Sequence, residues 1–311
     1  MNNKTLIVIV GPTGIGKTDL GIYLAKKLGT EIVSADSRQF YKELKTGTAV
    51  PSDEELKTVK HHFIGNKSIH DYYNASSFEF EVIGLLNELF KKRNPLILLG
   101  GSGMYVDAVC RGIDDLPEID MDIRNMLIEK HEKEGIESLR FELKKLDPDY
   151  YAITDLKNPK RLLKALEITM MTGQPYSVFR KKEIKKRDFD TIKIGLNIER
   201  EDLYKRIEQR VDKMIASGLV EEARQFYQFR NLNSLNTVGY KEFFSYFDGE
   251  YSLERAIELI KRNSRRYAKR QLSWFKRDKE INWFKPDEKE KILNFVLSAK
   301  KIKKAANSRI K

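Results

Sequence analysis

Apolar residues follow two different patterns along the N-terminal part of the chain. Short continuous apolar runs cover Thr5 to Val10, Glu31 to Ser34 and Pro95 to Leu99. Such runs are typical of strands that are buried on both faces. Between them, apolar residues at helical spacing predict helices at Lys17–Leu28 and Phe78–Lys92. Because strands alternate with helices, we expect an α/β fold with a parallel sheet and with ligand sites at the carboxyl ends of its strands.

The pattern changes between residues 117 and 187, where no buried strand is visible. Helical periodicity is found there in four segments, Asp122–Glu134, Ile136–Leu146, Pro159–Met171 and Ser177–Lys185. A strand-like alternation returns from Thr191 to Ile198, and helices are then predicted at Arg200–Ser217, Val220–Phe229, Tyr240–Phe247, Ser252–Phe275 and Lys289–Ala306. We therefore expect an α/β core of residues 1–116 and 188–311, interrupted by an all-helical insertion domain at 117–187.

Composition changes this picture little, but it narrows the class of protein. A chain of 311 residues with 33% charged residues suits a soluble protein of one large or two small domains. No apolar run reaches the roughly 18 residues of a membrane span, and the first residues resemble a buried strand more than a signal peptide. The single cysteine, Cys110, excludes an intrachain disulfide and a cysteine-based metal cage. A cytoplasmic protein is the simplest expectation.

The charge is the first indication of a partner. The formal net charge is +12, and residues 261–270 contain six basic residues and no acid. Residues 300–311 add six more basic residues, again without an acid. A lysine-rich proteome with evenly spread charge is the simpler alternative, but this concentration toward the C-terminus favours a polyanion such as nucleic acid.

The strongest motif follows the first predicted strand. It consists of Gly11, Pro12, Thr13, Gly14, Ile15, Gly16, Lys17 and Thr18, which fit the Walker A pattern between a strand and a helix. The glycines permit a tight turn whose N–H groups point inward and form an anion site with the helix N-terminus. Lys17 adds a charge for the terminal phosphate, and the Thr18 hydroxyl can ligate Mg²⁺. The motif predicts a phosphate or diphosphate site without specifying a nucleotide.

A carboxylate follows the second predicted strand, in the segment Ser34-Ala35-Asp36-Ser37-Arg38-Gln39. At that position Asp36 would lie beside the phosphate loop, where it could hold Mg²⁺ or act as a general base. The alternative is a helix N-cap, for which Asp and Ser are both suited. Arg38 and Gln39 are able to hydrogen-bond a base edge.

Glycines also follow the third predicted strand, as Gly100-Gly101-Ser102-Gly103. They either let the chain approach a ligand, with Ser102 as a donor near the phosphates, or form a plain strand-to-helix turn. No Walker B aspartate ends this strand, which counts against an ordinary ATPase.

Aromatic residues are interleaved with the basic cluster near the C-terminus. Basic side chains contact phosphates and aromatic rings stack on bases, so this region fits RNA. The alternative is a solvated helix face with its aromatic residues in the core, which we favour for Trp274 and Phe275. We expect His61 and His62 to be structural, because no Cys or Glu stands at metal-ligand spacing from them.

Taken together, these motifs resemble the tRNA dimethylallyltransferase (tRNA isopentenyltransferase) family over about residues 4 to 285. The number and order of the matching motifs make the resemblance specific, which a phosphate loop alone would not be. The matching segments are Gly11–Leu20, Glu31–Tyr41, Thr46–Pro51, His61–Ile64, Pro95–Tyr105, Asn158–Glu167, Asp202–Glu222, Val238–Glu242 and Tyr267–Phe275.

The resemblance implies a P-loop NTPase-like fold and a prenyl transfer. Enzymes of this family move a dimethylallyl group from dimethylallyl diphosphate to N6 of adenosine 37 in the tRNA anticodon loop. By resemblance Asp36 is the base, Lys17, Ser102 and Arg210 meet the diphosphate, and Mg²⁺ is the cofactor. The target base must be flipped out of the loop to react.

The resemblance also implies which residues contact tRNA. The insertion domain would grip the anticodon stem-loop, and the protein would be a monomer without a membrane partner. The implied tRNA-binding residues are Asp36, Ser37, Arg38, Gln39, Ser102, Arg124, Lys160, Arg161, Leu162, Leu163, Lys164, Thr237, Val238, Gly239, Tyr240, Lys241, Glu242, Lys269, Arg270 and Gln271.

The chain departs from the family pattern at a few positions. Gly14-Ile15 replaces the commoner Ala-Ser, Val50 stands where lysine is frequent, and Ser102 where threonine is frequent. None of these changes removes a required group. With one cysteine, the chain has no zinc finger of the eukaryotic kind, which implies a bacterial-type enzyme.

Three other functions share part of this pattern. A P-loop small-molecule kinase would need an arginine-rich lid and gives no reason for the basic C-terminal region. An adenylate isopentenyltransferase, which acts on free AMP, would need no large basic surface. An RNA-binding module without activity would not need the phosphate loop joined to Asp36.

Overall fold

The computed structural model describes residues 4–117, 120–181 and 183–308, with only the backbone for residues 300–308. The basic side chains of the segment 300–311 therefore lie outside the described part. The chain divides into two compact units, residues 1–110 with 187–311 and residues 111–186, and each is described by itself.

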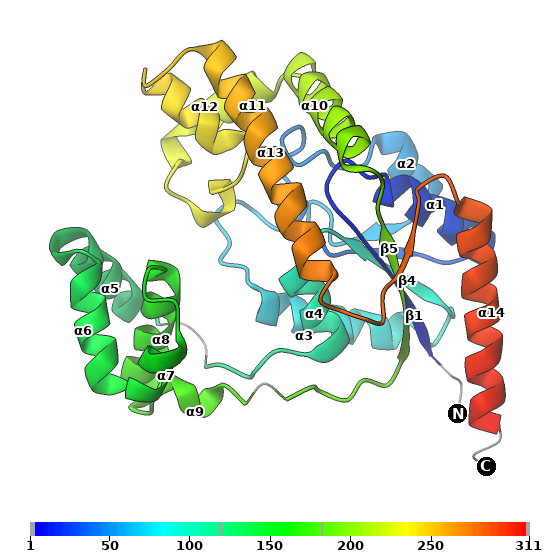
Figure 1. Cartoon of the computed structure of the whole chain (residues 1–311), viewed down its shortest axis with the longest axis horizontal. Helices are drawn as coiled ribbons and strands as arrows, with labels where there is room; N and C mark the ends of the chain where they lie inside the picture. The colour runs from blue at the N-terminus through cyan, green and yellow to red at the C-terminus, as the bar shows by residue number, and fades with distance from the viewer. Residues whose placement is uncertain (1–3, 118–119, 182, 309–311) are drawn as a thin grey trace. The chain divides into compact units, whose positions relative to one another are not determined.

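The first unit is built on a sheet of six parallel strands in the order β3-β2-β4-β1-β5-β6. Its strands β1, β4 and β5 are labelled in Figure 1. The α/β fold with a parallel sheet is thereby confirmed. All strands end at the same edge of the sheet, so the loops after β1, β2 and β4 lie next to one another. The strands are β1 (Thr5–Val10), β2 (Ile32–Ser34), β3 (His61–His62), β4 (Leu96–Gly100), β5 (Asp190–Leu196) and β6 (Asn282–Phe284).

Helices bury both faces of the sheet. Along β1, Ile7 and Ile9 belong to one apolar cluster, while Leu6, Val8 and Val10 belong to the other. Each side chain buried in this way contributes about 1.5–3 kcal/mol. The first cluster includes residues of α1 (Lys17–Leu28), α10 (Arg200–Ala216) and α14 (Lys289–Ser308), and the second includes residues of α3 (Ala75–Leu89) and α4 (Gly103–Arg111). In the described part of the chain, no helix is long and apolar enough to cross a membrane.

A third cluster joins α10 to α11 (Leu219–Gln225), α12 (Tyr240–Phe247) and α13 (Leu253–Phe275). The helix predicted over Val220–Phe229 is interrupted, because α11 ends at Gln225 and a 3₁₀ turn follows at Tyr227–Phe229. This turn places the Tyr227 ring against Phe244 and Phe247, so aromatic packing overrides the helical pattern. Two short elements complete the unit, α2 (Asp53–Thr58) and a 3₁₀ turn at Asn233–Leu235.

The second unit contains α5 (Met121–Glu134), α6 (Ile136–Leu146), α7 (Pro148–Ile153), α8 (Pro159–Thr172) and α9 (Tyr176–Phe179). It has its own apolar cluster, to which α5, α6, α7 and α8 all contribute. The prediction of a helix over Ser177–Lys185 is wrong beyond Phe179. There Arg180 lies over the Tyr150 ring, and the Lys185 N–H donates to Arg111 O at 2.8 Å, so the chain runs back beside the segment by which it entered.

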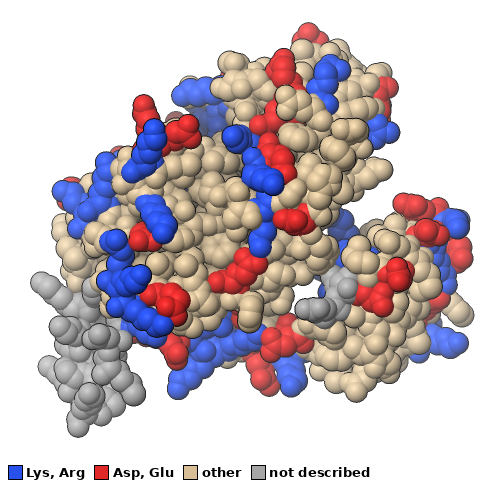
Figure 2. Space-filling view, turned by 180° about the vertical axis from the view of Figure 1, so that it is seen from behind, with Lys and Arg blue, Asp and Glu red and all other residues tan. Residues whose placement is uncertain are grey.

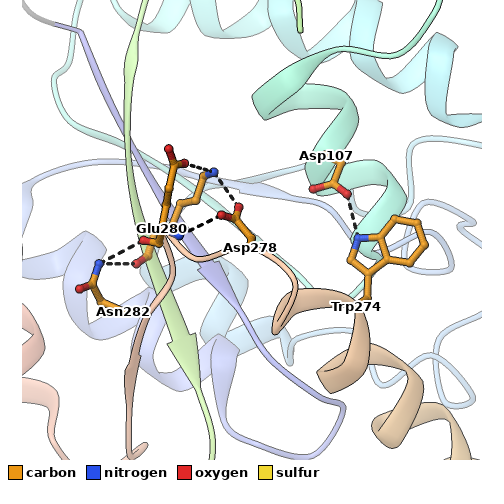
Figure 3. Close-up of polar contacts among 6 residues, drawn as sticks. Asp107, Trp274, Asp278, Glu280 and Asn282 are labelled. Carbon is orange, nitrogen blue, oxygen red and sulfur yellow. Dashed lines mark hydrogen bonds and ion pairs between the residues drawn. The ribbon is translucent and has the colours of Figure 1, made fainter. Parts of the chain in front are cut away.

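Two sets of polar contacts fix the C-terminal end of α13 (Figure 3). The buried Lys193 of β5 donates to Asp278 at 2.7 Å and to Glu280 at 2.6 Å, just after α13. The Trp274 indole donates to Asp107 of α4 at 2.8 Å. Phe275 is buried as expected, but Trp274 is 37% exposed, so its prediction as a core residue is wrong. These contacts hold α13 at the edge of the sheet where the loops meet.

The basic residues of α13 are partly neutralised by another helix. Lys261 pairs with Asp212, and Arg265 pairs with Glu208, both on α10. Basic and acidic side chains are likewise interspersed on the face of the molecule seen in Figure 2. The sequence run of six basic residues therefore overstates the charge that α13 presents, because α10 supplies acids from elsewhere in the chain.

Candidate active site

The phosphate loop joins β1 to α1 and has the backbone that its glycines allow. Gly14 has φ +77° and Gly16 has φ +97°, in the left-handed region that other residues rarely adopt. Ile15 is fully buried in the core and anchors the loop from below. Helix α1 begins at Lys17 without a side-chain cap, so its first N–H groups remain available to an anion.

Lys17 lies over this loop in an environment that disfavours its charge. Its ammonium group donates to the carbonyl oxygen of Pro12 at 2.8 Å. Burial lowers the pKa of Lys17 to about 8, Asp36 opposes this shift, and Arg210 adds to it. Lys17, Asp36 and Arg210 are therefore close enough to influence one another, although they come from α1, the loop after β2 and α10.

The pKa of Lys17 predicts how diphosphate binding depends on pH. Protonated Lys17 attracts the ligand, so affinity for inorganic diphosphate should fall as the pH rises through about 8. Calorimetric titration across this range measures the effect. Lys17→Arg is the control, because arginine stays charged over this pH range. The pH dependence that remains in this variant reports the titration of diphosphate itself. Identical profiles for the two proteins would contradict this assignment.

Asp36 follows β2 and does not cap a helix. One of its carboxylate oxygens accepts the N–H of Arg38 at 3.0 Å, and residues 37–40 form a turn. The helix-cap alternative is therefore wrong. In this Asx-type turn the local hydrogen bond orients the carboxylate and leaves its other oxygen able to accept a proton.

Arg38 and Gln39 point into the protein and hold two neighbouring segments. The Arg38 guanidinium donates to the carbonyl oxygens of Asn233 and Ser234, each at 3.0 Å. The buried Gln39 amide donates to the carbonyl oxygens of Thr48 and Ala49, at 3.4 and 3.2 Å. The Gln39 amide is thus engaged by the protein itself, and its contact with a base edge stays a prediction, while Arg38 lines the pocket described below.

The loop after β4 is glycine-rich because protein groups approach it closely. A Cβ on Gly100 would lie 2.2 Å from Ala35 O, and one on Gly101 would lie 2.3 Å from the Gln271 amide nitrogen. The Ser102 hydroxyl is buried, accepts the N–H of Ser37 at 2.9 Å and lies 3.0 Å from the Ser37 hydroxyl. Ser102 thus links the loops after β4 and β2.

Gln271 of α13 joins the phosphate loop to the loop after β4. Its side-chain oxygen accepts the N–H of Thr13 at 2.8 Å, and its amide nitrogen donates to Gly101 O at 2.8 Å. The Gln271 side chain is buried, with both ends engaged by the protein, so it positions Thr13. Its contact with tRNA stays a prediction.

These elements enclose a pocket of about 480 Å³ within the first unit. It brings together the phosphate loop, the Asp36 turn, α10 and the basic face of α13, which the sequence could only place separately. The predicted residues Ser37, Thr237, Val238 and Lys241 also line it. The lining residues are Thr13, Asp36, Ser37, Arg38, Gly47, Thr48, Ile207, Arg210, Val211, Met214, Asn236, Thr237, Val238, Lys241, Glu242, Ile260, Asn263, Ser264, Arg266, Tyr267 and Arg270.

Sequence reasoning missed part of this lining. Ile207, Val211 and Met214 recur at helical spacing around Arg210 and form one face of α10. That periodicity could have identified them once Arg210 had been chosen. Gly47 and Thr48 could not be placed in this way, because a loop carries no periodicity.

The segment 237–242 contributes in two different ways. Thr237, Val238 and Lys241 line the pocket, whereas Tyr240 is fully buried in the third apolar cluster. The Glu242 carboxylate accepts the N–H of Gly239 at 2.8 Å and the Asn263 amide at 2.7 Å, so it mainly caps α12. The Tyr240 side chain therefore serves packing, and its contact with tRNA stays a prediction.

Two residues of the second unit that are predicted to contact RNA, Arg124 and Lys164, lie next to one buried acid. Glu167 is 2% exposed and lies 3.6 Å from Arg124 and 3.9 Å from Lys164. It holds both cations on one surface. Leu162 is fully buried in the core of this unit, so its side chain serves packing, and its place in the tRNA-binding segment stays a prediction. Lys160 and Arg161 are exposed at the start of α8.

The oxygen ligands near the phosphate loop suit a magnesium ion carried by a diphosphate. The Thr18 hydroxyl is half-buried and makes no hydrogen bond within the described residues. The described part of the chain holds no cluster of three His, Cys, Asp or Glu residues that could bind a metal unaided. Because Mg²⁺ prefers oxygen ligands and keeps several from water and phosphate, Thr18 and the diphosphate together fit it.

Comparison with known proteins agrees with this geometry. The IPP transferase family matches residues 39–278. The chain is 53% identical over 296 residues to tRNA dimethylallyltransferase 1 of Bacteroides fragilis, covering 95% of this chain and 98% of that protein. It is 52% identical to tRNA dimethylallyltransferase of Christiangramia forsetii, covering 92% of this chain and 95% of that protein.

Solved structures extend the similarity to the fold. The full-length tRNA isopentenylpyrophosphate transferase of Bacillus halodurans has a TM-score of 0.73 at 35% identity, covering 98% of this chain and 100% of that one. A eukaryotic dimethylallyltransferase acting on tRNA has a TM-score of 0.71 at 27% identity, covering 88% of this chain and 70% of that one.

Proposed function

The chain belongs to the tRNA dimethylallyltransferase family, and we propose that it transfers a dimethylallyl group from dimethylallyl diphosphate to N6 of adenosine 37 in tRNA. The observation that carries this proposal is the single pocket shared by the phosphate loop, Asp36 and α13. Thr13 of the phosphate loop, the Asp36 carboxylate and the basic, aromatic face of α13 line this one cavity, which fits a reaction between an anionic donor and an RNA base.

The transfer requires a base at the adenine amine. The N6 lone pair is delocalised into the ring, so N6 is a poor nucleophile. As N6 attacks C1 of the donor, the N–C bond forms, the C1–O bond breaks, and diphosphate leaves with the bonding electrons. The carboxylate of Asp36, oriented by the N–H of Arg38, accepts the proton that N6 loses.

The diphosphate gains negative charge as it leaves, and the phosphate loop is suited to stabilise it. Inward N–H groups, the start of α1 and protonated Lys17 act together as a preorganised anion site. Mg²⁺ bound with Thr18 and the diphosphate would add positive charge at the leaving oxygens.

Arg210 is the second cation for the diphosphate in this proposal. It lies at the pocket near Lys17 and Asp36, burial lowers its pKa, and its guanidinium makes no hydrogen bond or ion pair within the described residues. Arg210 is half-buried, and Asp36 favours its charge without forming an ion pair with it, so an anionic ligand at this position would add a favourable interaction.

Replacing Arg210 with alanine should raise the KM for dimethylallyl diphosphate about 10- to 100-fold, as expected for loss of a charged hydrogen bond. Binding of tRNA should change little. Steady-state kinetics with each substrate varied in turn measure both effects. Arg206→Ala, at an exposed position one turn earlier on α10, is the matched control. An unchanged donor KM in Arg210→Ala would contradict the assignment.

The RNA would be held by several surfaces. Arg266, Tyr267 and Arg270 line the pocket on α13, where basic groups meet phosphates and an aromatic ring stacks on a base. In the second unit, we propose that Arg124 and Lys164 contact the anticodon stem-loop from the surface that Glu167 organises. We also propose a cytoplasmic monomer, in keeping with a substrate that is itself cytoplasmic.

One experiment separates this function from its rivals. The protein is incubated with Mg²⁺, labelled dimethylallyl diphosphate and either unmodified tRNA or AMP. Label should appear on tRNA and be lost when adenosine 37 is replaced by guanosine. Label on AMP alone would identify an adenylate isopentenyltransferase, and transfer to neither would contradict a prenyltransferase.

A further inference from the structure

A short loop lines the pocket together with Asp36, and we call it the wall loop (residues 45–49). Gly47 and Thr48 line the pocket that contains Asp36. The wall loop also borders a second cavity of about 860 Å³, which Lys45, Thr46 and Ala49 line. A shift of the wall loop would therefore change the shape of the pocket that contains Asp36.

A single carboxylate holds the wall loop from behind. Glu222 of α11 accepts the N–H groups of Lys45 at 3.1 Å, Thr46 at 2.8 Å and Gly47 at 2.8 Å. Three successive backbone donors thus converge on one side chain, in an arrangement that elsewhere binds free anions. Here the anion is supplied by the protein.

The same carboxylate also connects the wall loop to α12. The hydroxyl of Tyr240, at the start of α12, donates to Glu222 at 2.6 Å. The Tyr240 ring lies so close to Gly47 that a Cβ there would be 2.5 Å from the phenol oxygen. Burial and the Glu222 carboxylate raise the pKa of Tyr240, so the phenol stays protonated and keeps donating.

The wall loop is also connected to the Asp36 turn. Gln39, three residues after Asp36, donates to the carbonyl oxygens of Thr48 and Ala49. Ala49 has φ +45°, a left-handed conformation that a non-glycine residue adopts only when its surroundings impose it. The wall loop is therefore held from two sides, by Gln39 and by Glu222.

We propose that Glu222 is a positioning residue for the transfer reaction. It holds the wall loop in the position from which the backbone of this loop places the target base at Asp36. This inference rests on the proposed function. It assigns the recognition of the base's position to the backbone of residues 47 and 48, and the control of that backbone to Glu222. A misplacement of about 1 Å between reacting groups can cost about 100-fold in rate, so the effect should fall on kcat.

The test is Glu222→Gln, with the neighbouring exposed Glu221→Gln as matched control. The glutamine would turn its NH₂ group toward backbone donors and lose at least one of the contacts. We expect kcat for tRNA to fall about 10- to 100-fold, with little change in the KM for tRNA or in the affinity for inorganic diphosphate. Glu221→Gln should retain wild-type kinetics.

A second variant covers the case in which Glu222→Gln does not fold. Gly47→Ala places a methyl group against Tyr240 and displaces the wall loop while Glu222 remains intact. It should give the same pattern, a lowered kcat with diphosphate affinity retained.

Two results would overturn the inference. One is a folded Glu222→Gln protein with wild-type kcat. The other is a parallel loss of kcat, tRNA binding, diphosphate binding and melting temperature, which would indicate a merely structural role. Failure of the wild-type protein to label tRNA is a separate outcome, which would contradict the proposed function and not the role of Glu222.

Discussion

Replacing Asp36 with asparagine should lower the rate of dimethylallyl transfer by about 10²- to 10⁴-fold, the usual contribution of a general base. The asparagine oxygen can still accept the N–H of Arg38, so the turn should keep its shape. What is lost is a group that accepts the proton from N6. Affinity for tRNA and for diphosphate should therefore change much less than the rate.

Single-turnover kinetics with saturating enzyme measure the transfer step directly, and filter binding measures tRNA affinity. Glu54→Gln, at an exposed position on α2, is the control for loss of a carboxylate. If Asp36→Asn loses tRNA binding in proportion to its rate, Asp36 is a recognition residue. If its rate stays near that of the wild type, another group is the base.

Replacing Lys17 with methionine should abolish measurable use of dimethylallyl diphosphate and, at the same time, stabilise the unliganded protein. The fall in pKa of Lys17 from 10.5 to about 8 corresponds to a cost of about 3 kcal/mol for keeping its charge in the folded state near pH 7. Methionine removes that cost but also the hydrogen bond to Pro12, worth about 1 kcal/mol. A net gain of about 2 kcal/mol is expected.

The direction of the pKa shift determines how the stability difference between Lys17→Met and wild type changes with pH. Since the pKa is lowered on folding, the cost is fully present below about pH 8 and disappears as the pH rises toward 10.5. The difference in unfolding free energy between Lys17→Met and wild type should shrink over that range in urea titrations. Lys26→Met, on the exposed side of α1, should show no such gain. A destabilised Lys17→Met protein would contradict the prediction.

The parts of the fold that sequence could predict are those with strong local determinants. The phosphate loop and helix Lys17–Leu28 were both evident, because glycine, lysine and helical periodicity act locally. The short strands β3 and β6 were not, since two or three residues give no periodicity and depend on a neighbouring strand for pairing. The end of α9 depends in the same way on Tyr150, about thirty residues earlier.

The site shows the same limit. Asp36 could be chosen from its position after a strand and Lys17 from the Walker A pattern. Nothing in the sequence indicated that the side-chain amides of Gln39 and Gln271 bond backbone groups. A polar residue in a motif offers hydrogen bonds, and only the folded chain decides whether a ligand or the protein receives them. Tyr240 and Leu162 show the same limit for apolar residues, because both lie in segments predicted to bind tRNA while their side chains are buried.

The bridge made by Gln271 has a consequence for binding. One glutamine connects α13, which lines the pocket, to the amide of Thr13 in the phosphate loop. Any displacement of α13 on binding tRNA is therefore transmitted to the cradle of the leaving group. If tRNA binding displaces α13, thermodynamic reciprocity requires that the donor and the tRNA alter each other's affinity by the same factor.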